Sequence, residues 1–161
     1  MYKLRSTKTV YEWLNEYGES HQSIVNELIH WVCVPLIIFS ILSLIWIIPT
    51  PNYFDNSFIL INWCVLFVVV SSFYYLLLSL KLSLTIIPFA FFLIYIIYLL
   101  DKFNLPLLEI SIVVFIIAWA GQFIGHIIEG KRPSFIQDIQ FLMIGPIWLI
   151  ASLYRRLNIK F

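Results

Sequence analysis

The chain has 161 residues, of which 61% are hydrophobic and only 12% are charged, and its formal net charge is +1. This composition excludes an ordinary soluble domain and is typical of a membrane protein, here a single membrane domain over residues 1–161. Its ten Lys and Arg residues are scattered and build no basic face, so nucleic acid is excluded as a partner.

Residues 6–18 predict an N-terminal amphipathic helix. Val10, Trp13, Leu14 and Tyr17 recur at helical spacing and form one apolar stripe, and Gly18 favours a helix end. We expect this helix to lie at the membrane interface, and an ordinary helix docked on protein is the alternative. The segment lacks the apolar core of a signal peptide, so the amino terminus is predicted to stay in the cytosol.

Five apolar blocks follow in residues 20–161, and most approach the roughly 20 residues that cross a bilayer. Their ranges are 31–48, 58–80, 82–100, 107–128 and 139–154. Because they lack the alternating pattern of barrel strands, the spans should be helices. The predicted fold is all-α: a multi-pass transmembrane helical bundle with four to five membrane segments and an N-terminal interfacial helix.

The final block contains Gly145-Pro146. The Lys and Arg residues of the connections put the amino terminus inside, so a fifth full span would carry Arg155 and Arg156 outside. Proline removes a backbone donor and clashes with the preceding turn. We therefore expect a broken, re-entrant or tilted segment that returns the tail to the inside, and a plain fifth span is the competing interpretation.

Polar side chains interrupt two of the helices at the same predicted depth, near the cytosolic side. They are Gln22, Asn26 and His30 on the first, and Gln122, His126 and Glu129 on the fourth. Polar groups within apolar spans are costly and usually mark a functional site. The alternative is that they only hold the helices together through hydrogen bonds.

The three histidines of the chain, His21, His30 and His126, all lie near this face. Imidazoles with a carboxylate such as Glu129 suit iron, zinc or copper, and two histidines with one carboxylate are typical of non-haem Fe(II) oxygenases. In an unbroken helix His21 and His30 would lie about 13 Å apart and roughly 180° around the axis. His21 can therefore join a shared ion only if the helix starts after it, near Ser23; otherwise it is a surface residue.

Two other functions stay open. His30 and His126 could be the axial ligands of a haem in an electron carrier, or the polar clusters could belong to a non-catalytic lipid-binding or structural protein. Three histidines are too few for a di-iron desaturase. Cys33 and Cys64 lie near opposite ends of their spans, so we expect free thiols rather than a disulfide.

Two motifs carry a resemblance that covers most of the chain. The first is H-x4-N-x3-H-x2-C-x-P, which begins at His21, and the second is W-x2-QFIGH, which ends at His126 and is followed by an acidic residue and KRPSF. Together they resemble the 2-hydroxy fatty acid dioxygenases of fungal α-oxidation and their bacterial relatives. The resemblance implies a membrane enzyme that uses Fe(2+) and O2 to shorten a 2-hydroxy fatty acid by one carbon, in a bacterial inner membrane or the endoplasmic reticulum.

The resemblance also implies roles for individual residues. His21, His30 and His126 match the histidines of the family, and Asn26 and Gln122 match its polar companions at the substrate. Glu129 is either a metal ligand, catalytic together with His30 and His126, or a hydrogen-bonding partner that fixes an imidazole. Lys131 and Arg132 are placed to attract the acid headgroup, unless they only mark the cytosolic side.

Overall fold

The computed structural model describes residues 8–50, 62–133 and 140–161, and in these ranges the chain forms helices only. They are α1 (Val10–Gly18), α2 (Ile24–Trp46), α3 (Trp63–Leu78), α4 (Leu80–Lys102), α5 (Leu107–Glu129) and α6 (Phe141–Arg156). The predicted all-helical class is therefore confirmed for the described residues. Helix α5 agrees with the predicted fourth block, whereas α2 begins seven residues before the predicted first block, at Ile24 rather than at residue 31.

Three helices, α2, α4 and α5, are long and apolar enough to cross a membrane, with 23 residues each. Helix α3 is apolar but has 16 residues, and residues 58–61 of the predicted second block lie outside the described ranges. Large apolar side chains point outward on the long helices: Leu84 is 67% exposed and Ile127 is 77% exposed. Such exposure is expected against lipid. A fourth and a fifth span stay predictions.

Helix α1 packs against α6. It begins with a capping box, in which the Glu12 carboxylate accepts a hydrogen bond from the Thr9 N–H at 2.6 Å, and it ends at Gly18, as predicted. Leu14 and Tyr17 are buried in the core that α6 dominates, and the Trp13 ring lies edge-on to an α6 ring. This is the docking that the sequence left as an alternative, and the position of α1 at a membrane interface stays a prediction.

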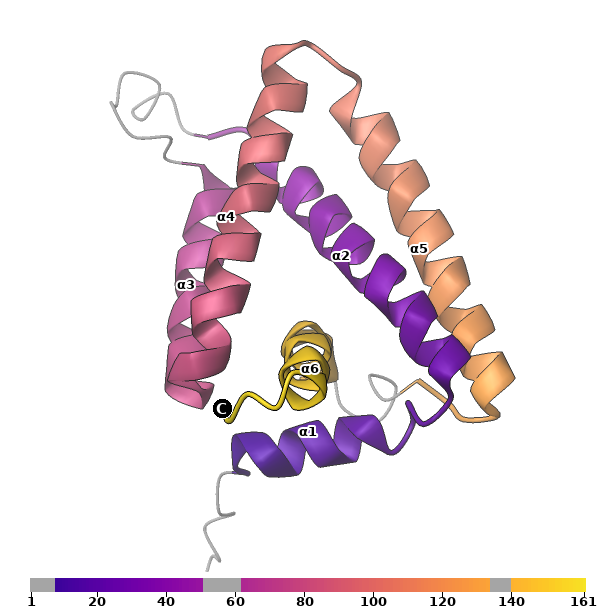
Figure 1. The fold of residues 1–161 in the computed structure, drawn as a ribbon. Helices are drawn as coiled ribbons and strands as arrows, with labels where there is room; N and C mark the ends of the chain where they lie inside the picture. Colours follow the sequence, from indigo (N-terminus) through magenta and orange to yellow (C-terminus); the bar gives the residue numbers. More distant parts are fainter. Residues whose placement is uncertain (1–7, 51–61, 134–139) are drawn as a thin grey trace, which may run out of the picture.

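Helix α6 runs without a break through Gly145 and Pro146, so the predicted break is wrong. Pro146 removes one helical hydrogen bond, but every residue from Ile144 to Ala151 is buried, and this packing holds the helix together. In Figure 1, α6 is seen along its axis, whereas α2, α4 and α5 run along the plane of the picture. Helix α6 therefore crosses the candidate spans instead of running beside them.

The C-terminal tail returns to the end of the bundle that carries α1 (Figure 1). The Tyr11 hydroxyl donates a hydrogen bond to the Phe161 carbonyl, and the two rings stack with centroids 5.7 Å apart. The Lys81 ammonium donates to the Lys160 carbonyl at 2.9 Å. Both ends of the described chain thus lie at the same end of the molecule as the polar clusters on α2 and α5.

Candidate metal centre

Close packing of α2 on α5 creates the site. Gly121 and Gly125 are four residues apart on α5 and face α2. A Cβ atom at Gly121 would lie 2.6 Å from the Cys33 Sγ, and one at Gly125 would overlap the Asn26 side-chain oxygen. Small residues at this spacing let two helix backbones approach closely. The stretch GQFIG carries this spacing in the sequence, and hydropathy and polar positions alone do not reveal it.

The three histidines converge between α1, α2 and α5. Their nearest ring nitrogens all lie within 4.8 Å of one another, and each side chain is buried. The ring centroids of His30 and His126 are 5.1 Å apart, and His21 lies 4.4 Å from the first and 4.9 Å from the second. His21 can reach this place because α2 begins only at Ile24, after a Ser23 N-cap, which is the helix start that the sequence required.

Backbone carbonyls fix the orientation of two of the rings. The His21 Nδ1 lies 2.7 Å from the Tyr17 carbonyl oxygen, and the His30 Nδ1 lies 2.9 Å from the Asn26 carbonyl oxygen. A carbonyl can only accept, so both Nδ1 atoms carry the proton and donate. The Nε2 atom of each neutral ring then presents a lone pair, and these two atoms lie 3.0 Å apart. Facing lone pairs repel each other, whereas a cation between them would bind both.

The surroundings of His21 keep its ring neutral. Burial, and then the neighbouring His30, lower the pKa of His21 to about 3. The Tyr17 ring stacks on His21 with centroids 4.1 Å apart, and the Trp148 ring lies 5.1 Å away. The His126 Nδ1 is buried with no hydrogen-bond partner among the described residues. Neutral, buried imidazoles with unused nitrogens are the form that binds a metal ion, so the donor set fits a divalent cation.

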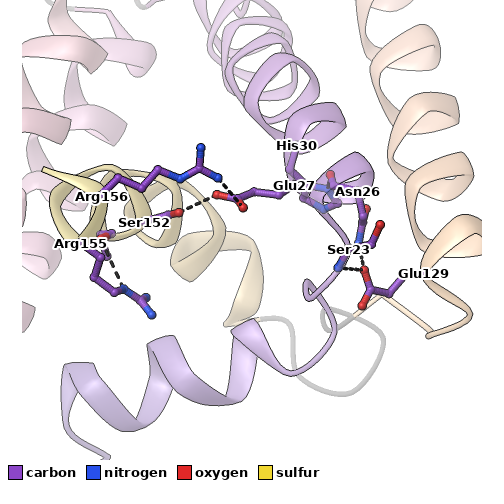
Figure 2. A network of polar contacts seen from close by, with 9 residues as sticks. Ser23, Asn26, Glu27, His30, Glu129, Ser152, Arg155 and Arg156 are labelled. Atoms are coloured by element: carbon purple, nitrogen blue, oxygen red, sulfur yellow. Dashed lines mark hydrogen bonds and ion pairs between the residues drawn. The ribbon is translucent and has the colours of Figure 1, made fainter.

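Glu129 lies beside this cluster and is engaged by the start of α2, as Figure 2 shows in part. Its carboxylate accepts hydrogen bonds from the backbone N–H of Gln22 at 2.9 Å, from the backbone N–H of Ser23 at 2.7 Å and from the Asn26 amide at 3.3 Å. A carboxylate at a helix N-terminus satisfies otherwise unpaired N–H groups. Glu129 is thus placed to fix the segment that carries His21, while its role as a metal ligand stays a prediction.

A second polar contact ties α2 to α6 (Figure 2). The Glu27 carboxylate accepts hydrogen bonds from the Ser152 hydroxyl at 2.6 Å and from the Arg156 guanidinium at 2.8 Å. On the same helix, the Trp148 ring packs against Tyr17 and lies near His21, so α6 is held beside the cluster. The polar and apolar pattern of the sequence predicts neither the Glu27 contact nor the Tyr17 stack, although Tyr17 is four residues before His21.

A small cavity of about 90 Å³ opens next to the cluster. Gln122 and His126 line one side, Tyr17 lines another, and the remaining walls are apolar, with Trp119 and Ile41 among them. The cavity gives a second ligand access to His126. Gln122 lines this cavity, and its contact with substrate stays a prediction.

The other predicted substrate contacts lie elsewhere. Asn26 is fully buried, and its amide donates to the Ser20 carbonyl and to Glu129 instead of facing the cavity. Lys131 and Arg132 are exposed on the segment after α5, and the Lys131 ammonium donates to the Glu19 carbonyl. Neither basic side chain lines the cavity beside His126. Their attraction of an acid headgroup stays a prediction.

Comparison with known protein families gives one match. Residues 7–157, which include every helix and all three histidines, match the family described as 2-hydroxy-palmitic acid dioxygenase Mpo1-like. Neither the comparison with curated proteins nor the comparison with solved structures gave a significant match. Since the family match covers nearly the whole chain, this membrane protein belongs to the Mpo1-like family of 2-hydroxy-palmitic acid dioxygenases.

Proposed function

We propose that this chain is an Fe(II)-dependent membrane dioxygenase that shortens a 2-hydroxy fatty acid by one carbon with O2. The observation that carries the proposal is the convergence of His21, His30 and His126, with two Nε2 lone pairs facing each other at 3.0 Å. The description of the family supports the substrate class. Iron is proposed because imidazole donors suit it and because the chemistry requires a metal that reacts with O2.

The reaction balances without an external reductant. The bond that joins the carboxyl carbon to the hydroxyl-bearing carbon breaks, and a new C–O bond forms on the latter. One O2 molecule accepts the four electrons that are released when the 2-hydroxy acid becomes the shorter acid, carbon dioxide and water. Fe(II) held by His21, His30 and His126 would supply the redox chemistry with O2 and would attract the hydroxyl and carboxylate end of the acid.

The residues of the chain would orient the reactants and exclude water. The backbone carbonyls of Tyr17 and Asn26 hold the His21 and His30 rings with their Nε2 atoms inward. Gln122 is within the cavity beside His126, where its amide can donate a hydrogen bond to the bound acid. The aromatic rings of Tyr17 and Trp148 cover His21 and keep bulk water from the cluster.

The membrane orientation belongs to the same proposal. We place the amino terminus and the histidine cluster at the cytosolic side of a bacterial inner membrane or the endoplasmic reticulum, because the basic residues of the connections gather at that end. Lys131 and Arg132, exposed just after α5, would attract the acid headgroup to this side before it reaches the cluster.

The geometry favours this proposal over a haem protein. A haem with two axial histidines needs the imidazoles on opposite faces of a porphyrin. Here the rings of His30 and His126 are 5.1 Å apart, and His21 contacts both. This arrangement leaves no space for a macrocycle between them, whereas a single ion fits.

The test uses the full chain in detergent or nanodiscs, loaded with Fe(II) without oxygen. Wild-type protein should hold on the order of one iron per chain, consume O2 with 2-hydroxypalmitic acid and release pentadecanoic acid, which mass spectrometry detects. Palmitic acid and 3-hydroxypalmitic acid, which cannot chelate in the same way, should give no product. Undiminished turnover by His126→Ala, or iron-loaded wild-type protein that is inert towards every 2-hydroxy acid, would overturn the proposal.

A further inference from the structure

The cavity beside His126 does not end at the cluster. It shares four of its lining residues with a second cavity of about 210 Å³, namely Ile38, Ile41, Leu142 and Pro146. These four residues stand between the two cavities, which therefore adjoin each other. We call the two adjoining cavities the crevice: it begins at Gln122 and His126 and extends along α2, between α6 and the α3–α4 pair.

The second cavity is apolar. Its walls include Phe67 and Val68 of α3, Leu42 of α2 and Ala90 of α4. Tyr75 also lines this cavity. Its hydroxyl donates a hydrogen bond to the Met143 carbonyl at 3.0 Å, so this donor is already used within the protein. A cavity of this character accepts a hydrocarbon and penalises a polar ligand.

The length of the crevice agrees with a long hydrocarbon chain. From His30 at the cluster to Leu42 in the second cavity, α2 advances 12 residues, or about 18 Å at the helical rise per residue. One leaflet of the bilayer hydrocarbon core, which lipid acyl chains fill, is about 15 Å thick. The path from the histidine cluster to the far end of the crevice is therefore about as long as this acyl region.

We infer that the crevice between α2, α3, α4 and α6 binds the acyl tail of the substrate, and that its far end at Leu42 and Ala90 sets the chain length. This inference rests on the proposed function, because the histidine cluster would hold the polar head. Leu142 is 42% exposed and Phe67 is 41% exposed, so both stand at the outer rim of the crevice. A tail can thus pass sideways from the lipid between α6 and α3 while its head reaches His126.

Two variants test whether the acyl tail lies in the crevice, because obstruction of the crevice should change which acyl-chain length the enzyme prefers. Ala90→Leu fills the far end, and Leu142→Trp narrows the junction between the two cavities. In each, the ratio of turnover of 2-hydroxypalmitic acid to turnover of 2-hydroxyoctanoic acid should fall at least tenfold. The matched control is Ala120→Leu, which adds the same side chain on an exposed position of α5 and should keep the wild-type ratio. A wild-type ratio in both test variants would overturn the inference.

A binding experiment separates this inference from the proposed chemistry. A 2-hydroxypalmitic acid that carries a diazirine at its terminal carbon is photolysed with wild-type protein after chelation of metal, so that no turnover is needed. The label should fall on residues 67–75 of α3 and 86–90 of α4, and excess unlabelled acid should displace it. Label on the lipid-facing side of α5, or label that the unlabelled acid does not displace, would overturn the inference. Specific labelling by a protein that never consumes O2 would instead keep the tail site and reject the reaction.

Discussion

His21 and His30 point their Nε2 atoms at each other across 3.0 Å, while the Nδ1–H group of each ring is held by a backbone carbonyl. In each neutral ring the single N–H proton is therefore on Nδ1, and the Nε2 atom that faces the other ring has none. An added proton or a cation would relieve the repulsion between the two lone pairs, and burial, which lowers the pKa of His21 to about 3, opposes the proton. A metal ion that His126 also binds would satisfy all three rings.

His21 is the histidine whose place in the cluster depends most on the tertiary fold. His21→Ala should weaken Fe(II) binding by about 100-fold or more, because a direct ligand matters more than the supporting contacts that are worth 10- to 100-fold. Competition with a chromophoric chelator measures the affinity. Gln22→Ala is the neighbouring control, since it keeps the backbone N–H that Glu129 binds. Equal Fe(II) affinities in His21→Ala and Gln22→Ala would show that His21 is an ordinary core residue and not a metal ligand.

Metal removal should lower the stability of the protein. An ion that binds only the folded state at about 100 times its dissociation constant adds about 2.7 kcal/mol to the free energy of unfolding. Chelation should therefore lower the unfolding temperature of the wild-type protein in detergent, and added Fe(II) should restore it. In His21→Ala the unfolding temperature should not respond to Fe(II). A wild-type unfolding temperature that ignores both treatments would contradict a metal bound to the folded state.

Glu129 is expected to position the cluster rather than to bind the ion, because its two oxygens are occupied by the N–H groups of Gln22, Ser23 and Asn26. Glu129→Ala should weaken metal binding by about 10- to 100-fold. The visible spectrum of the cobalt(II)-substituted protein should nevertheless stay unchanged, since the ligands are the same. Glu129→Gln, which keeps one acceptor oxygen, should restore part of the affinity. A changed cobalt spectrum in Glu129→Ala would assign Glu129 as a ligand instead.

Tyr17→Phe tests whether the Tyr17 hydroxyl contacts the substrate. The hydroxyl lies beside Gly145, and both residues line the cavity next to His126. Phenylalanine keeps the ring that stacks on His21 and removes only the donor. A hydrogen bond to a charged group contributes about 1.5–3 kcal/mol, so kcat/KM for the 2-hydroxy acid should fall by roughly 10- to 100-fold. Iron affinity should not change. A fall in iron affinity with an unchanged kcat/KM would assign Tyr17 to the support of His21 alone.

Gly125→Ala tests the close approach of α2 and α5. The new Cβ would overlap the Asn26 side-chain oxygen, so the helices must separate or Asn26 must move. Overpacking of this kind costs about 1–3 kcal/mol, and the displaced α2 carries His30 away from His126. The variant should unfold at a lower temperature and bind iron more weakly. Ala120→Val, on an exposed position of the same helix, should do neither.

Local features of the sequence determined the class of the protein and most of its helices. Hydropathy and composition are properties of short segments, so the end of α1 at Gly18 and the course of α5 could be predicted without any contact between helices. The same is true of the candidate ligands, because three histidines stand out in a chain of this composition. The two histidine motifs were also sufficient to indicate the family.

Only the tertiary structure decided how these residues act together. Whether His21 joins the cluster depends on a turn before α2, and the partners of the Glu129 carboxylate lie more than a hundred residues away in the chain. Helix α6 passes through Pro146 unbroken because burial on all sides compensates for a missing hydrogen bond, which no local rule for proline can include. The crevice likewise needs side chains from four helices. Sequence periodicity describes which face of a helix is apolar, whereas packing between distant segments determines which faces meet.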